Sequence, residues 1–100
     1  MDRLHKEAPM TNLADTLAER GSRYGTFVSH AAITQDLKHL MNEHLITRHK
    51  TLPSDMQEAL DMIAHKIGRI INGDHNYPDS WVDIAGYAKL VADRLEGVVR

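Results

Sequence analysis

The chain has 100 residues, of which 42% are hydrophobic and 26% charged, the composition of a single globular domain. Twelve basic and fourteen acidic residues leave a net charge of −2, so there is no sequence case for DNA binding through a basic surface. The absence of cysteine excludes disulfides, thiolate catalysis and cysteine-based zinc sites. No apolar run approaches the roughly 20 residues of a membrane span, and we expect a cytoplasmic protein.

The first half of the chain predicts an arm and two helices. Residues 1–10 are charged, lack periodicity and contain Pro9, so we expect a flexible N-terminal arm before a single helical domain over residues 11–100. A short helix is predicted from Thr11 or Asn12 to a stop at Gly21. A second helix is predicted from about Thr26 to His44. Its apolar face would carry His30, Ile33, Leu37, Leu40, Met41 and His44.

The second half predicts two longer helices joined by a loop. Ser54 with Gln57, and Ser80 with Asp83, have the spacing of capping boxes that would open helices over Ser54–Gly73 and Ser80–Leu95. The core stripe of the first would be Met56, Ala59, Leu60, Ile63, Ile67 and Ile70. That of the second would be Trp81, Ile84, Ala85, Ala88, Val91, Ala92 and Leu95. The predicted fold is therefore all-α, a small helical bundle centred on a long antiparallel helical hairpin.

Apolar residues also lie outside these stripes. Tyr87 and Leu90 fall on another flank of the last helix, and Met62 falls on the far side of the third. Helices that are apolar on more than one face are usually buried on more than one face. We therefore predict a homo-oligomer formed through the Ser54–Gly73 and Ser80–Leu95 helices; the alternative is scattered surface hydrophobes.

Acidic residues raise the question of a metal site. Glu58 and Asp61 share a face with His65, and Asp79 and Asp83 lie one turn apart. Paired carboxylates on neighbouring helices are what a Mg²⁺-dependent phosphate-cleaving site requires. The helical wheel, however, points the first group away from the core stripe, which favours a solvated face.

Cations and aromatic residues near the hairpin form a second group of candidates. Lys66 and Arg69 lie one turn apart and face Asp79 and Asp83 across the loop, which predicts either a cross-helix salt-bridge network or a site for an anionic ligand. The turn from Arg20 to Gly25 includes Tyr24, a combination suited to stacking a base and holding a phosphate, although plain turn chemistry is the simpler interpretation. The candidate ligand-binding residues are Lys66, Arg69, Asp79, Asp83, Tyr87, Arg20 and Tyr24.

A resemblance adds context to these patterns. Its motifs are Arg20-Gly21 with Tyr24-Gly25, Lys66-Ile67 with Arg69-Ile70 and Asn72-Gly73-Asp74, and Asp79-Ser80-Trp81-Val82-Asp83-Ile84-Ala85-Gly86-Tyr87-Ala88. Together they resemble a small phage and prophage family of unknown function, over roughly residues 19–96, which implies a bacterial host. The last motif further resembles the final core helix of MazG-like all-α nucleoside triphosphate pyrophosphohydrolases and of phage domains associated with nucleotide modification.

The resemblance implies a role in nucleotide metabolism but departs from the enzymes at the metal site. The enzymes hold Mg²⁺ with paired glutamates on one helix and an acidic pair on the next. Here Asp79 and Asp83 match the second pair, whereas Lys66 and Arg69 stand near the positions of the first. We therefore expect a nucleotide-linked protein that binds a nucleotide or, less readily, hydrolyses a nucleoside triphosphate with Mg²⁺. The alternative is a non-enzymatic interaction module, such as a phage inhibitor of a host protein.

Overall fold

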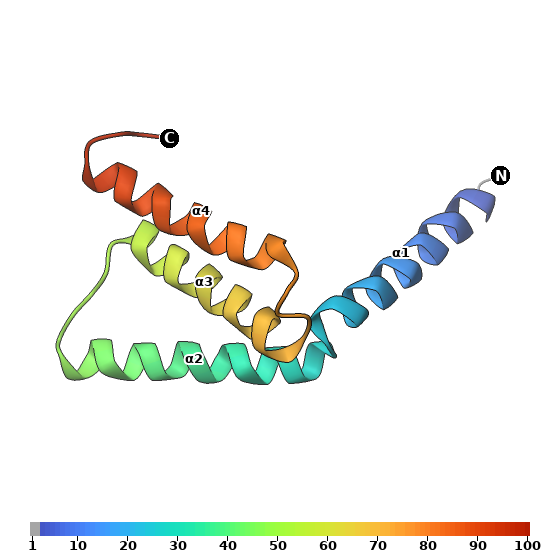
Figure 1. The fold of residues 1–100 in the computed structure, drawn as a ribbon, viewed down its shortest axis with the longest axis horizontal. Helices are drawn as coiled ribbons and strands as arrows, with labels where there is room; N and C mark the ends of the chain where they lie inside the picture. The colour runs from blue at the N-terminus through green and yellow to red at the C-terminus, as the bar shows by residue number, and fades with distance from the viewer. Residues whose placement is uncertain (1–2) are drawn as a thin grey trace.

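The computed structural model describes the backbone of residues 3–100 and the side chains of residues 12–100. Its elements are α1 (Arg3–Tyr24), α2 (Phe27–Thr47), α3 (Ser54–Asn72) and α4 (Pro78–Leu95), with no strand in that part of the chain. The predicted all-α bundle around an antiparallel α3–α4 hairpin is confirmed. Figure 1 shows α3 lying between α2 and α4, while α1 projects away from the end where α3 turns into α4. No helix among the described residues is long and apolar enough to cross a membrane.

The first helix differs from its prediction at both ends. It begins at Arg3 rather than near Thr11. Met1, Asp2 and the side chains of residues 1–11 lie outside the described part, and the flexible arm stays a prediction. The helix also continues through Gly21, where a stop was expected. It ends before Gly25, whose φ of +78° is the left-handed conformation that commonly terminates helices at glycine.

Neither predicted capping box forms. Pro53 is the N-cap of α3 and Tyr77 that of α4, and neither provides a side-chain cap hydrogen bond. The helix α4 begins at Pro78, two residues before Ser80, because proline fits the first helical position, where its missing N–H costs nothing. Ser80 is consequently buried inside the first turn. The helix α2 does have a side-chain cap, since the Thr26 hydroxyl accepts from the Ser29 amide at 3.3 Å.

The central helix α3 is buried along two opposite flanks. On one flank Gly68 meets His30 and Thr34 of α2, and on the other Lys66 pairs with Asp83 of α4. The residues predicted as its core stripe lie between these flanks and are covered only in part. Ala59 is buried, Leu60 is 37% exposed, and the other four residues of the stripe are half-buried. Ala59 and Ala64 are the buried apolar side chains among the residues that the structure describes, so one chain alone builds a small core.

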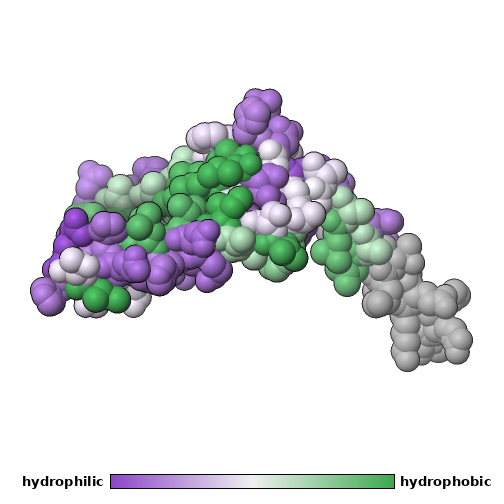
Figure 2. All heavy atoms as spheres, turned by 90° about the horizontal axis from the view of Figure 1, so that it is seen from below, coloured by the Kyte–Doolittle hydropathy of each residue, from purple (hydrophilic) through white to green (hydrophobic). Residues whose placement is uncertain are grey.

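The chain exposes more surface than a compact monomer. Its accessible area is 7422 Å² and its radius of gyration 17.5 Å. A compact chain of this size would expose about 5,700 Å² and have a radius of gyration of about 13 Å. Figure 2 shows apolar side chains gathered in the middle of the helical layer and a separate apolar patch on the described part of α1. An isolated chain therefore leaves about 1,700 Å² beyond the area of a compact fold.

Candidate functional site

The end of α1, the start of α2 and the end of α3 meet at one point, which we call the corner. Asn72 fixes it, because its side-chain amide donates to the carbonyl oxygens of Tyr24, at 2.7 Å, and Thr26, at 3.0 Å. The Asp74 amide also donates to the carbonyl oxygen of Arg23. Gly73 allows this close approach, since a side chain there would overlap the backbone of Arg23 and Tyr24.

Two arginines and two tyrosines form a stacked ladder at the corner. The Arg69 guanidinium carbon lies 4.3 Å from the centre of the Tyr24 ring, and Tyr24 meets Tyr77 edge-on with ring centres 6.1 Å apart. Arg23 lies 4.6 Å from the Tyr77 ring centre and donates to the Tyr77 hydroxyl at 2.7 Å. Each cation faces an aromatic ring, an arrangement in which the ring quadrupole attracts the charge.

Two carboxylates lie at one end of this ladder, beside Arg23 and Tyr77. Arg23 also pairs with Glu19 of its own helix at 3.3 Å. A hydrogen bond to Asp79, together with burial, raises the pKa of the Tyr77 hydroxyl above its usual value. Asp79 therefore lies close to the ladder, and it would oppose an incoming anion there.

The Lys66–Asp83 pair links α3 and α4. The ammonium nitrogen lies 3.0 Å from the carboxylate, and the two side chains are 11% and 45% exposed respectively. This is the cross-helix ion pair that was one of the two interpretations of these residues. The pairing satisfies the charge of a buried lysine, which leaves Arg69 as the half-buried cation of α3 that faces a ring instead of a carboxylate.

The structure brings most, but not all, of the predicted ligand-binding residues together. Lys66, Arg69, Asp79, Asp83 and Tyr24 lie at the corner or next to it. Tyr87 lies one turn further along α4, where it lines a groove with Leu90, and Arg20 is exposed on α1. The candidate residues did not include Arg23, Asn72 or Tyr77. Arg23 belongs to the turn that was predicted to stack a base, and Asn72 belongs to one of the motifs that carry the resemblance, but neither was expected to bind a ligand.

The acidic candidates do not converge. Glu58 is exposed, and Asp61 accepts a hydrogen bond from Gln57 at 3.1 Å. Among the side chains that the structure describes, no group of three or more histidines and carboxylates is placed to hold a metal ion.

His65 departs from its predicted solvent-facing position. It is half-buried, and its ring packs edge-on against that of His30 with centres 4.5 Å apart. His30 is buried and donates through Nε2 to the His65 carbonyl oxygen at 2.9 Å, as expected of a hydrogen-bonded histidine at the core edge. Burial, followed by repulsion from His30, Arg69 and Lys66, lowers the pKa of His65 to about 4.

We expect this histidine to make the fold acid-sensitive. Between pH 6.5 and 4 the unfolded chain protonates His65 while the folded chain does not, so stability falls as the pH falls through that interval. The loss from this residue should be about 1–2 kcal/mol after allowance for solvent screening of a partly exposed ring. Urea unfolding followed by circular dichroism at pH 7, 5.5 and 4.5 would measure it. His65→Gln should flatten the pH dependence relative to the unmodified chain, and an equal slope in both would contradict the assignment.

Comparison with known proteins places the chain in a family without assigning it an activity. No curated protein and no solved structure matches it. The predicted links to phage proteins and to MazG-like enzymes therefore stay predictions. A family model described as a domain of unknown function (DUF6378) matches residues 11–95, most of the chain, and the protein belongs to this family.

Proposed function

We propose that this protein is a non-enzymatic helical interaction module that works as a homo-oligomer, assembled through the α3–α4 hairpin. The observation that carries the proposal is the apolar stripe of α3, which the chain covers only in part. Between α3 and α4 it lines an open groove, which we call the hairpin groove. Its lining residues are Leu52, Met56, Ala59, Leu60, Ile63, Ala88 and Val91.

The lining of the hairpin groove contains no charged side chain. In a protein that buries so little apolar area within one chain, such a surface is a marker of protein–protein contact. Burying one leucine-sized side chain contributes about 1.5–3 kcal/mol, so several of them across an interface offset the entropy cost of association. The area in excess of a compact monomer, about 1,700 Å² per chain, is also more than the roughly 800 Å² that each partner of a standard stable interface buries.

The outer flank of α4 provides a further apolar surface. Tyr87 and Leu90 line it together with Val82 and Gly86, and charged side chains border it: Asp83, Lys89, Asp93 and Arg100. Leu90 is 50% exposed, which agrees with its expected place outside the core stripe. This flank and the hairpin groove belong to the same pair of helices, so both support assembly through the hairpin.

Light scattering on the purified chain at tens of micromolar tests the proposal. The mass should exceed that of one chain, and Leu60→Glu should reduce it, because the substitution places a carboxylate in the hairpin groove. Leu90→Glu combined with Tyr87→Ala should weaken assembly through the outer flank. The matched control is Val28→Glu, at a position 79% exposed on α2 outside the groove, which should leave the mass unchanged. A one-chain mass for the unmodified protein would refute the proposal.

We propose as a second candidate that the corner binds a small anionic ligand such as a nucleotide. The stack of Arg69 on Tyr24, at the end of the ladder away from Asp79, favours it, because it offers a guanidinium to a phosphate and aromatic surface to a base. Calorimetry against a panel of nucleotides, with and without Mg²⁺, tests this candidate. Binding should weaken in Arg69→Gln but not in Arg20→Gln, whose side chain lies on exposed α1. No heat of binding at millimolar nucleotide would exclude it.

A further inference from the structure

The helix α1 has an apolar stripe without a partner in its own chain. Leu13 and Leu17 are 52% and 58% exposed, and their spacing of four residues places them on one face of the helix. Asp15 lies on the opposite face. The contacts of α1 with its own chain involve α2 and α3 and are concentrated at the corner. A helix whose apolar face is left in water gains little stability from packing, so contact with a partner would stabilise the projecting part of α1.

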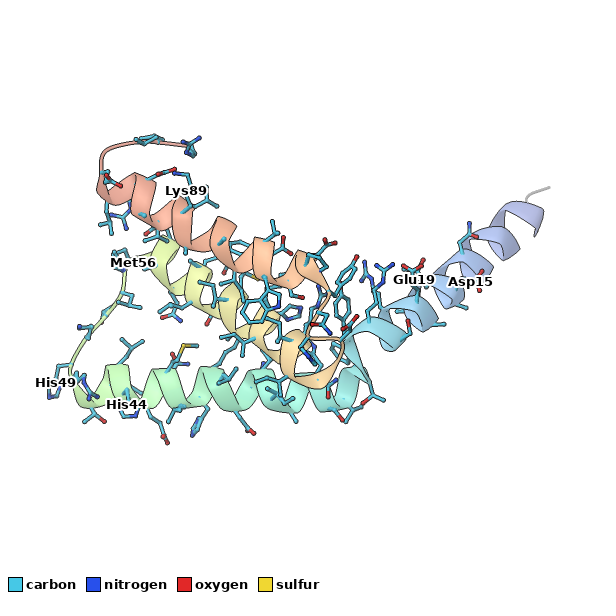
Figure 3. The ribbon with its side chains drawn as sticks, in the orientation of Figure 1. Asp15, Glu19, His44, His49, Met56 and Lys89 are labelled. Carbon is cyan, nitrogen blue, oxygen red and sulfur yellow. The ribbon has the colours of Figure 1, made fainter. Side chains whose placement is uncertain are left out.

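The hairpin groove is an apolar surface on which such a helix can dock. Met56 and Leu60 of α3 and Val91 of α4 line it, with Leu52 at one end. Figure 3 shows Met56 at the start of α3, at the end of the hairpin away from the corner, and Asp15 and Glu19 on the projecting α1. An amphipathic helix docks in a groove of this kind by inserting residues spaced three or four apart. The pair Leu13 and Leu17 supplies that spacing.

The α1 helix of the same chain does not reach this groove. Only Gly25 and Thr26 separate α1 from α2, and Asn72 binds the carbonyl oxygens on both sides of Gly25. The corner therefore holds α1 in a direction that leads away from the hairpin (Figure 1). A helix that is fixed in this direction can cover a groove only on another molecule.

The groove is long enough for this pair. Its α3 lining from Met56 to Ile63 spans about 10 Å, and Leu13 and Leu17 lie about 6 Å apart along α1, at 1.5 Å per residue. From these observations we propose that α1 of one copy lies in the hairpin groove of a second copy, with Leu13 and Leu17 against Met56 and Leu60. This inference rests on the self-association proposed above and names the segment that provides it. If each of two chains places its α1 in the hairpin groove of the other, the assembly closes as a twofold dimer. We call this arrangement α1 exchange.

Single cysteine substitutions test α1 exchange, because the unmodified chain has no cysteine that could form a competing disulfide. Leu17→Cys and Leu60→Cys would be purified separately, mixed and oxidised. We expect a disulfide-linked two-chain product from this mixture. Asp15→Cys mixed with Leu60→Cys is the matched control and should give little product, since Asp15 lies on the other face of α1. Circular dichroism and light scattering on each variant confirm that it retains the helices and the mass of the unmodified chain.

A second measurement does not depend on disulfide geometry. Leu13→Glu with Leu17→Glu should lower the mass toward one chain at concentrations where Asp15→Lys leaves it unchanged. Two results together would refute α1 exchange if the unmodified chain is an oligomer. The Leu17→Cys and Leu60→Cys chains would form no disulfide-linked product, and the double glutamate variant would keep its mass. The chain would then assemble through another surface. If the unmodified chain has a one-chain mass, self-association itself fails.

Discussion

Gly73→Ala should cost about 3 kcal/mol or more of folding free energy, which is large for the addition of one methyl group. A Cβ at this position would lie 2.6 Å from the carbonyl carbon of Tyr24 and closer still to the carbonyl oxygen of Arg23. Both neighbours are backbone atoms, and a rotamer change cannot move them. The Asn72 side chain binds the same segment, so relief would require separating the end of α1 from the end of α3.

Denaturant unfolding at one fixed chain concentration would measure this loss, because the apparent stability of an oligomer depends on concentration. Gly86→Ala is the matched control. A Cβ there meets no atom within 4 Å, and alanine is the better helix former by about 0.5–1 kcal/mol. Equal unfolding midpoints for the two variants would show that the corner is not packed as described.

The second large effect on folding stability should come from the Lys66–Asp83 pair. Removing the carboxylate should destabilise the fold more than removing the lysine charge. Asp83→Asn leaves a lysine that is 11% exposed without its counter-charge, and we expect a loss of about 2–3 kcal/mol. Lys66→Met removes the buried charge and replaces it with an apolar chain of similar length. The Asp83 carboxylate that remains is 45% exposed and stays hydrated, so this variant should lie within about 1 kcal/mol of the unmodified chain.

Thermal melts of the two single variants and of the double variant Lys66→Met with Asp83→Asn separate these contributions. The double variant should recover most of the loss caused by Asp83→Asn, because it no longer contains an unpaired buried cation. If the loss in the double variant equals the sum of the two single losses, the residues do not interact, and the ion pair has no role in joining α3 to α4.

The four helices were predictable because their periodicity depends on local sequence. The residues at which the helices begin and end were harder to predict. Ser54 and Gln57 have the spacing of a capping box, yet the chain before them places the N-cap at Pro53. At the α4 start, Pro78 takes the first helical position and moves Ser80 inward. In both cases a proline within two residues of the expected cap decided where the helix begins, since its fixed φ is already helical or extended.

The candidate site was partly predictable for a related reason. A loop of five residues joins α3 to α4, so Lys66 and Asp83 had to be neighbours, and their pairing could be expected. The stack of Arg69 on Tyr24 joins residues 45 positions apart, and only the tertiary fold brings them together. Periodicity likewise showed which face of α3 is apolar, but not that the chain covers this face only in part. That distinction depends on how the helices pack, which a single sequence does not specify.

The separation of the corner from the hairpin groove has a consequence for valency. The residues of the stacked ladder do not line the groove, so an assembly that closes the groove leaves one corner free on every chain. A dimer then presents two identical copies of whatever the corner contacts. Two weak binding sites on one dimer bind a bivalent target with an apparent affinity well above that of either site alone. This requires that the distance between the two sites matches the distance between the two epitopes of the target. Self-association would in this way set the strength of binding elsewhere on the molecule.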